Sequence, residues 1–304
     1  MPRSGGNGGS SMMSSRRDSA QREAVAPTVT PLTLGRAASS ALYDELALSP
    51  KPGLVTLTDV GSHDDMDAQT FTRSLFALRG YFVRMAELGT QAAPFSELQR
   101  SGLDAEQRML AATGGVNTHR GAIFLLGLLC AAGGALAAAG QLPTPQQLQA
   151  VLRRHWGEAL AHKAARPSSL PGGMAARRLG LRSAAQEAAL GFPVLFGVTV
   201  PTLREGLARG RSVWVARTDA LFATMAVLDD SNLAHRGGLA GLRHAQAAAR
   251  GFMAAGGAAQ PDGRWRAEAI GKDFVARRLS PGGAADMLSA ACWLQRIGGL
   301  RDAA

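Results

Sequence analysis

The sequence predicts an all-α protein, a single globular multi-helix domain with buried central helices. Apolar residues recur at steps of three and four, and Phe71, Leu75, Leu78 and Phe82 form one such stripe. The alternation typical of strands is almost absent, and residues 192–200 are the one ambiguous apolar run. Aromatic residues make up only 5% of the chain while Ala and Gly abound, so we expect helices that approach closely through small side chains.

The first helices follow from these stripes and from their end signals. We expect one over residues 36–48, ended by a turn at Pro50, and a second over residues 65–88. Ser101-Gly102-Leu103-Asp104 resembles a capping box, so a third helix should begin there and end at Gly114-Gly115.

The later helices are assigned in the same way. Thr144-Pro145 is a helix start. The buried face of that helix should consist of Leu148, Val151, Leu152, Trp156 and Leu160. Further helices are expected near residues 182–191, 201–209, 212–229, 238–255, 264–278 and 283–297.

One segment has the length of a membrane span. Residues 121–140 contain no charge, but Gly133-Gly134 and many alanines interrupt the run, and aromatic belts are missing from its ends. A membrane-anchored helical protein is therefore the weaker interpretation, and we expect a fully buried central helix.

The ends of the chain and its thiols suggest the compartment. Residues 1–34 are rich in Gly, Ser, Arg and Pro and lack an apolar core, so we expect a disordered extension before a helical domain at 35–304. Cys130 and Cys292 lie in apolar helical stretches, as buried thiols of a reducing cytosol would. A cytoplasmic protein is expected.

The net charge of +10 raises the possibility of a basic nucleic-acid-binding helical protein. Against it, the basic residues are spread along the chain and no aromatic residues are interleaved for base stacking. Only Lys51, Lys163 and Lys272 are lysines among the 33 basic residues. A lysine that persists in such an arginine-rich chain suggests a need for a compact ammonium group, which draws attention to Lys51.

Four polar clusters each precede a predicted helix, and together they hold three of the six histidines. Free amides at a helix start, an adjacent arginine and glycines that allow close approach together bind phosphate well. Each cluster alone is a common helix start, but four of them indicate one shared pocket. The clusters are Lys51-Pro52-Gly53 with Gly61-Ser62-His63-Asp64-Asp65-Met66-Asp67, then residues 114–121, 229–238 and 280–286.

The carboxylates raise the question of a metal. No spacing of His or Cys matches a zinc site, whereas oxygen-rich clusters favour magnesium, held by one or two carboxylates and substrate phosphates. If this stretch is helical, Asp64 and Asp67 share a face and Asp65 points elsewhere. A Ser-His-Asp nucleophile lacks the strand–turn–helix elbow that would support it.

These clusters resemble, in order from about residue 41 to 300, the motif series of the triphosphoribosyl-dephospho-coenzyme A synthases. In that family pattern, Ala usually stands at the position of Ser62 and a basic residue at that of Asp64, which favours Asp65 over Asp64. The segments that carry the resemblance are Pro50-Lys51-Pro52-Gly53-Leu54-Val55, residues 61–67 with Phe71 and Ser74, residues 115–124, Asp230-Ser231-Asn232 with His235-Arg236-Gly237-Gly238, and residues 280–286.

The resemblance implies that the triphosphoribosyl group of ATP passes to the 2′-hydroxyl of 3′-dephospho-CoA while adenine leaves. A transferase would then load the product onto an acyl carrier protein of malonate decarboxylase or citrate lyase. The arginine-rich composition and Asp64 favour the malonate decarboxylase branch. The implied partners include no nucleic acid and no membrane, and the oligomeric state stays open.

Under this resemblance the residues receive expected roles. His63, Asp65, Asp67 and Asp286 are the catalytic candidates, and His63 or one carboxylate is the candidate base. Magnesium is inferred, with Asp65, Asp67 and Asp230 or Asp286 as its ligands or as stabilisers of the developing cation. The groups expected to bind substrate and phosphate are Lys51, Gly53, Asn117, His119, Arg120, Gly121, Asn232, His235, Arg236, Gly237, Ser280, Gly282 and Gly283. The main alternative is a magnesium-dependent all-α hydrolase of ADP-ribose or nucleotide glycosidic bonds.

Overall fold

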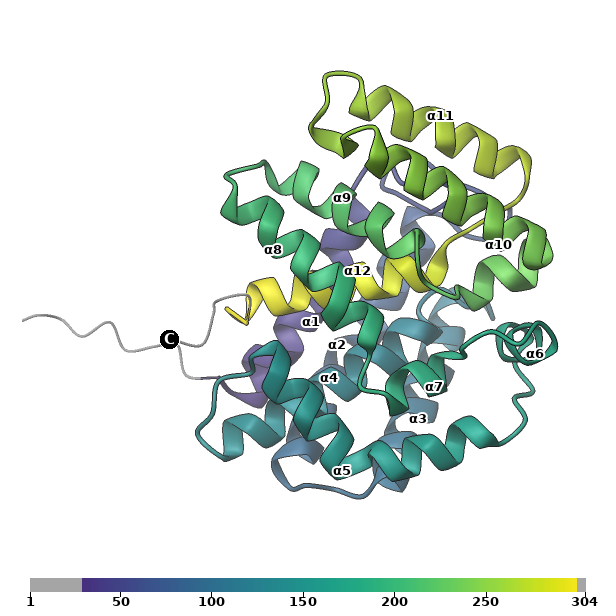
Figure 1. Ribbon diagram of the computed structural model, residues 1–304. Helices are drawn as coiled ribbons and strands as arrows, with labels where there is room; N and C mark the ends of the chain where they lie inside the picture. The colour runs from purple at the N-terminus through teal and green to yellow at the C-terminus, as the bar shows by residue number, and fades with distance from the viewer. Residues whose placement is uncertain (1–28, 300–304) are drawn as a thin grey trace, which may run out of the picture.

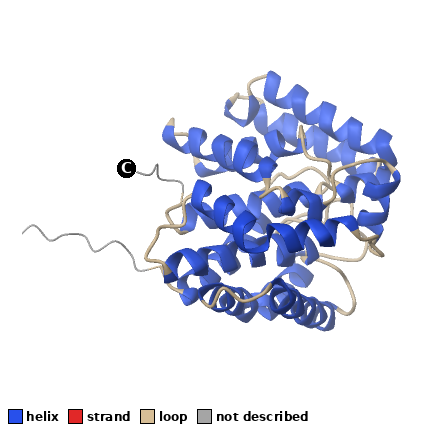
Figure 2. Ribbon diagram, turned by 60° about the horizontal axis from the view of Figure 1, so that its bottom comes forward, coloured by secondary structure: helices blue, strands red, loops and turns tan. Residues whose placement is uncertain are grey.

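The computed structural model describes residues 29–299, in which every regular element is a helix (Figures 1 and 2). The predicted all-α class is therefore confirmed. The predicted extension over residues 1–34 lies largely outside the described residues. The helices are α1 (Pro31–Ala47), α2 (Ala68–Thr90), α3 (Phe95–Thr113), α4 (Arg120–Ala138), α5 (Pro145–Ala165), α6 (Pro171–Arg178), α7 (Ala184–Ala189), α8 (Val200–Ala208), α9 (Val213–Met225), α10 (Ser231–Ala254), α11 (Gly263–Ala276) and α12 (Gly282–Arg296).

Two helices form the centre of the molecule. Helix α4 packs against α2 and α12, and 72% of its most apolar stretch is buried inside the protein. It is long and apolar enough to cross a membrane, but burial on this scale confirms the predicted core helix. Helix α12 crosses the middle of Figure 1 and contacts α1, α4 and α9, so it joins the early helices to the later ones.

Small residues let these central helices pack closely. A Cβ atom on Gly89 would lie 1.9 Å from the carbonyl oxygen of Ala131, and one on Gly134 would lie 2.0 Å from that of Ala86. Helices α2 and α4 can therefore touch backbone to backbone only because glycine stands at both positions. This contact explains how a core poor in aromatic residues is filled.

Several predicted helices match the structure closely. Helix α5 begins at Pro145 with a capping box at Thr144, and its buried residues are the five that the sequence predicted. Helix α3 ends at Gly114, whose φ of 67° is the left-handed conformation of a helix end. The ambiguous run at 192–200 is helical, with a π-helical turn at Leu195–Thr199 that leads into α8.

Four predicted boundaries are wrong. Helix α1 begins at Pro31, five residues before the expected start, because Thr30 forms a capping box with Thr33. Helix α3 begins after Pro94, so Ser101 lies inside it rather than at its start. Helix α2 begins after Asp67 instead of at residue 65. Helix α6 was not predicted.

The fourth wrong boundary is the start of α10. This helix begins at Ser231 and bends at Gly238, where φ is 63°. The expected start at residue 238 therefore marks a kink, since a glycine pair reads as a helix break although two helical turns precede it. As a result His235, Arg236 and Gly237 are helical residues, not loop residues.

Candidate active site

All four polar clusters border one cavity of about 1820 Å³. Helices α1, α3, α4, α5, α10 and α12 contribute to its wall, together with the loop before α2 and the connection from α5 to α7. The predicted convergence on one pocket is thus a property of the fold. The site residues predicted from sequence that line the cavity are His63, Asp65, Asn117, His119, Arg120, Gly121, Asn232, His235, Arg236, Ser280, Gly282, Gly283 and Asp286.

Five predicted site residues do not line the cavity: Lys51, Gly53, Asp67, Asp230 and Gly237. At two of these positions glycine lets the chain pass close to Leu279. A Cβ on Gly53 would lie 2.1 Å from the carbonyl oxygen of Leu279, and one on Gly237 would lie 2.5 Å from Cδ2 of the same residue. Both glycines thus hold the chain that leads into α12 close to the rest of the site.

Lys51 lies behind the cavity rather than on it. Its ammonium group is fully buried and forms an ion pair with Glu45 of α1, whose carboxylate does line the cavity. Burial lowers the pKa of Lys51 and raises that of Glu45, and the mutual attraction partly offsets both shifts. The sequence suggested that Lys51 binds a phosphate. In the structure Lys51 pairs with the carboxylate of Glu45 and holds it in place.

His63 belongs to a network that joins two distant parts of the chain. Its Nδ1 atom lies 3.0 Å from Nη2 of Arg236, and its Nε2 atom lies 3.0 Å from Oγ of Ser280. Because a guanidinium group can only donate, Nδ1 must accept and Nε2 must carry the proton. Burial and the charge of Arg236 both lower the pKa of His63, so the ring is neutral at pH 7.

The expected carboxylates of the first cluster are dispersed. Asp67 is the N-cap of α2, and its Oδ1 atom accepts from the backbone N–H of Thr70 at 2.8 Å. Asp64 and Asp65 precede the helix, so the proposed shared face of Asp64 and Asp67 is wrong. Asp65 is exposed, with a carboxylate oxygen 3.7 Å from Nδ1 of His63.

The second cluster places a buried histidine and a charged arginine at the start of α4. Nδ1 of His119 lies 2.6 Å from Oγ of Ser74, and the ring of Phe71 packs against the imidazole with 4.9 Å between centroids. Burial, reinforced by the charge of Lys51, lowers the pKa of His119 to about 3. His119 is therefore neutral and can offer a phosphate one N–H at most.

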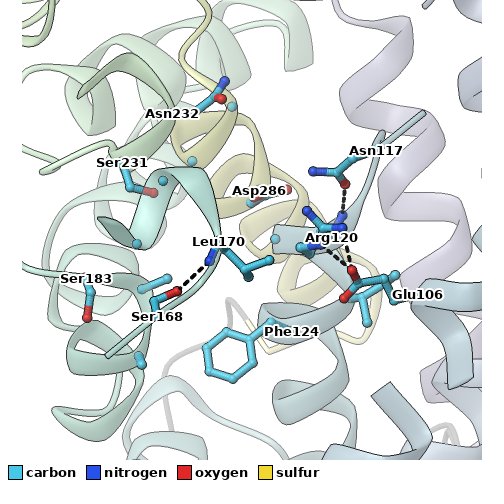
Figure 3. A pocket seen from close by; sticks show the side chains of 18 of the residues that line it. Glu106, Asn117, Arg120, Phe124, Ser168, Leu170, Ser183, Ser231, Asn232 and Asp286 are labelled. Carbon is cyan, nitrogen blue, oxygen red and sulfur yellow. Dashed lines mark hydrogen bonds and ion pairs between the residues drawn. The ribbon is translucent and has the colours of Figure 1, made fainter. Parts of the chain in front are cut away.

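Arg120 lies beside Glu106 and Asn117 at the cavity (Figure 3). Its guanidinium group forms an ion pair with Glu106 of α3, with 2.5 Å between Nε and Oε1. The side chain of Asn117 accepts from the backbone N–H of Arg120 at 3.1 Å and so closes the start of α4. Part of the positive charge of Arg120 is thus already neutralised.

Asp230 in the third cluster closes two helices at once. Its Oδ1 atom accepts from the N–H groups of Asn232 and Leu233 at 2.9 and 3.2 Å, at the start of α10. Its Oδ2 atom accepts from the N–H of Ala284 at 3.0 Å, at the start of α12. Burial raises the pKa of Asp230, and these backbone donors lower it. The carboxylate is a structural clamp between the two helix starts.

Asp286 of α12 is the carboxyl group at the centre of the cavity wall (Figure 3). A Cβ on Gly121 would lie 1.9 Å from its Oδ2 atom, so only glycine leaves room for it at the start of α4. Burial and the nearby charges of Glu45 and Asp230 raise the pKa of Asp286 well above its usual range, against a hydrogen bond from Ala122. Asp286 therefore binds a proton more readily than an exposed aspartate does.

The three expected magnesium ligands do not form one site. Both carboxylate oxygens of Asp230 accept hydrogen bonds from backbone N–H groups, and Asp67 caps α2. Of the three, only Asp65 lines the cavity. Within residues 29–299 no group of three or more His, Cys, Asp or Glu side chains is arranged to hold a metal ion. The residues present therefore do not fit a three-carboxylate magnesium centre.

Sequence reasoning missed two parts of the wall. Glu45 is one, although an acidic residue between Leu42 and Leu46 on the apolar face of a helix is a signal of a buried pair. The connection from α5 to α7 is the other. It repeats the Pro-Gly-Gly helix start of α12 at Pro171-Gly172-Gly173, and this repetition was the available clue.

An all-helical fold around a large cavity lined by imidazoles, arginines and buried carboxyl groups defines a helical enzyme that acts on anionic substrates. The model of the family described as ATP:dephospho-CoA triphosphoribosyl transferase (CitG) matches residues 31–303. The chain belongs to this family, and it is a transferase of the triphosphoribosyl-dephospho-CoA synthase type.

Curated relatives agree with this assignment over most of their length. A 2-(5″-triphosphoribosyl)-3′-dephosphocoenzyme-A synthase of Klebsiella pneumoniae is 39% identical over 270 residues, which cover 88% of this chain and 95% of the relative. Probable synthases of the same name from Azotobacter vinelandii and Acinetobacter calcoaceticus are 41% and 37% identical, and each alignment covers 86% of this chain and 89% of the relative. No solved structure matches the chain.

Proposed function

We propose that this chain transfers the 5-triphosphoribosyl group of ATP to the 2′-hydroxyl of 3′-dephospho-CoA and releases adenine. The observation that carries this proposal is a pair of carboxyl groups on one cavity wall, in opposite charge environments. Glu45 has the ammonium group of Lys51 as its partner, whereas Asp286 faces Glu45 and Asp230 without a cation. Two carboxyl groups set apart in this way are suited to different roles.

The reaction breaks the bond between C1″ of the ribose and N9 of adenine, and it forms a bond from C1″ to the acceptor oxygen. Positive charge develops on the ribose as adenine leaves. Glu45, kept ionised by Lys51, stabilises this charge. Asp286, whose pKa is raised well above its usual range by burial and by the neighbouring carboxylates, donates a proton to the departing adenine.

The proton of the acceptor hydroxyl needs a base. His63 is neutral, lines the cavity and has a lone pair on Nδ1, which accepts from Arg236 in the absence of substrate. In the proposed mechanism Arg236 turns to a substrate phosphate and frees Nδ1 to take the proton. His119 suits this role less well, because an imidazole with a pKa of about 3 binds a proton weakly.

The direct test is an incubation with ATP and 3′-dephospho-CoA, followed by chromatography and mass spectrometry. The expected result is adenine release only when both compounds are present, with a product heavier than dephospho-CoA by one triphosphoribosyl unit. Adenine release without the acceptor would instead identify a hydrolase of nucleotide glycosidic bonds. Absence of adenine under all conditions would contradict both functions.

We also propose that the product is the precursor of the prosthetic group of a malonate decarboxylase acyl carrier protein, loaded by a separate transferase in the cytoplasm. The arginine-rich composition and Asp64 support this branch over citrate lyase. The genes beside this one provide the test, because decarboxylase subunit genes are expected there. Citrate lyase subunit genes in that position would overturn the assignment.

A further inference from the structure

The cavity is larger than one substrate requires. Its volume of about 1820 Å³ exceeds the range of roughly 300–1,000 Å³ that is usual for a site with one small ligand. The catalytic candidates discussed so far border it on the side formed by the starts of α4 and α12. In Figure 3 the connection from α5 to α7, with Ser168 and Leu170, lies across the cavity from Arg120 and Glu106 and next to Ser231 at the start of α10.

This facing wall carries three basic side chains that have no anionic partner among the residues described. Lys163 at the end of α5, Arg166 after it, and Arg177 of α6 all line the cavity. None of the three side chains forms a hydrogen bond or an ion pair with another residue in the part of the chain that the structure describes. They are cations that border a cavity without an anionic partner.

By contrast, the arginines across the cavity already have partners. Arg120 is paired with Glu106, and Arg236 donates to His63 and to the backbone carbonyl of Ser62 at 2.9 Å. An anion that enters the facing wall therefore displaces no existing ion pair, so the full attraction of its charges is available for binding.

The geometry of the reaction decides which substrate uses this wall. In a single displacement at C1″ the acceptor oxygen approaches from the face of the ribose opposite the departing adenine. Asp286, the proposed proton donor to adenine, lies on the wall of α4 and α12. The acceptor must then come from the side of α5 and α6.

We propose that Lys163, Arg166 and Arg177 form a second anion subsite, which holds the diphosphate of the acceptor nucleotide. This inference rests on the proposed function, since it takes 3′-dephospho-CoA as the acceptor. The subsite determines affinity for the acceptor and leaves the binding of the ATP triphosphate to the opposite wall. Leu170 and Phe124, between the two walls, provide apolar surface for the uncharged arm of the same molecule.

Calorimetric titration of the purified enzyme with dephospho-CoA and, separately, with ATP tests the subsite. Lys163→Met, Arg166→Gln and Arg177→Gln should each weaken dephospho-CoA binding by about three- to tenfold, with larger losses when they are combined. ATP binding should stay within about twofold of wild type. Lys163→Arg keeps the charge and should retain most of the affinity.

Arg178→Gln is the matched control, because Arg178 is the next residue of α6, is exposed and does not line the cavity. It should bind both compounds as wild type does. Unchanged dephospho-CoA binding in the combined variant, or an equal loss of ATP binding, would overturn the subsite. Circular dichroism confirms that each variant is folded.

The same titrations separate this inference from the proposed function. If wild-type enzyme binds dephospho-CoA through these cations but releases no adenine with ATP, the transfer reaction is wrong and the subsite stands. If transfer occurs and the cations do not affect dephospho-CoA binding, the function stands and the subsite is wrong.

Discussion

Two segments of this protein contain Asn, His, Arg and Gly in the same order, yet they do opposite things. In residues 117–121 a helix begins at Arg120, so the histidine is buried in the cavity wall and the glycine leaves room for Asp286. In residues 232–237 the helix has already begun, and Arg236 reaches across to His63. The position of the helix start, rather than residue type, decides which side chains face the substrate.

The largest effect is expected at the carboxyl group beside the first segment. Asp286→Asn should lower adenine-releasing turnover by about 10²–10⁴-fold, because the amide cannot donate a proton to the leaving base. Stability should be little changed, since the amide has nearly the same size as the carboxyl group and removes the repulsion from Glu45 and Asp230. Turnover within threefold of wild type would exclude Asp286 as the proton donor, and denaturant unfolding serves as the control.

The two glycines of the compared segments should differ in sensitivity. Gly121→Ala places a methyl group 1.9 Å from the Asp286 carboxylate, so we expect turnover to fall by about 100-fold or more. Gly237→Ala meets only the end of the Leu279 side chain, at 2.5 Å, which can rotate away. We therefore expect a loss of less than tenfold, within the range of a modest shift in position. Equal losses in the two variants, measured as turnover, would refute this difference.

The aspartate before the second segment, Asp230, is expected to contribute more to stability than a cap of a single helix. Asp230→Ala removes the shared cap of α10 and α12 and should lower the free energy of unfolding by about 2–4 kcal/mol. Asp67→Ala removes the cap of α2 alone, at an exposed position, and should cost less. Urea denaturation measures both values, and a cost for Asp230→Ala no greater than that for Asp67→Ala would argue against the double cap.

The buried histidine of the first segment predicts a pH dependence. Its folded pKa of about 3 lies below the ordinary value of 6.5, so the stability it contributes is present above pH 6.5 and is lost as the pH falls toward 3. The slope should be up to about 1.4 kcal/mol per pH unit in that window. Denaturation of wild type and His119→Gln at pH 7 and pH 5 should show a shallower dependence in the variant, and equal slopes would contradict the burial.

Much of the fold could be predicted from the sequence because apolar stripes fix helices directly. Helices α5 and α4 are the clearest cases, since α5 has an apolar stripe at steps of three and four and α4 is apolar almost throughout after Arg120. Helix ends were harder to predict. Ser101 has the pattern of a capping box inside α3, and Gly238 bends α10 where a break was expected.

For the candidate site, the sequence predicted many of the residues that line the cavity but not the partners that each residue contacts. The sequence could indicate that polar helix starts meet, but it could not indicate that Lys51 would pair with Glu45 six residues earlier. Nor could the sequence distinguish the roles of Asp230 and Asp286, which both lie near the start of a helix and close to small residues. Asp230 accepts from backbone donors of its own helix and also from Ala284, 54 residues away. Asp286 meets mainly other carboxylates, Glu45 and Asp230, which are also remote in the chain.

The sharing of one carboxylate by two helix starts has a consequence for synthesis of the enzyme. Helix α12 is the last helix of the described residues, and it supplies both part of the central core and the Asp286 carboxyl group. A chain still emerging from the ribosome has neither a closed core nor the Asp286 carboxyl group in place until this helix docks on Asp230. Under the proposed mechanism, the growing polypeptide would therefore gain transfer activity only after this last docking step.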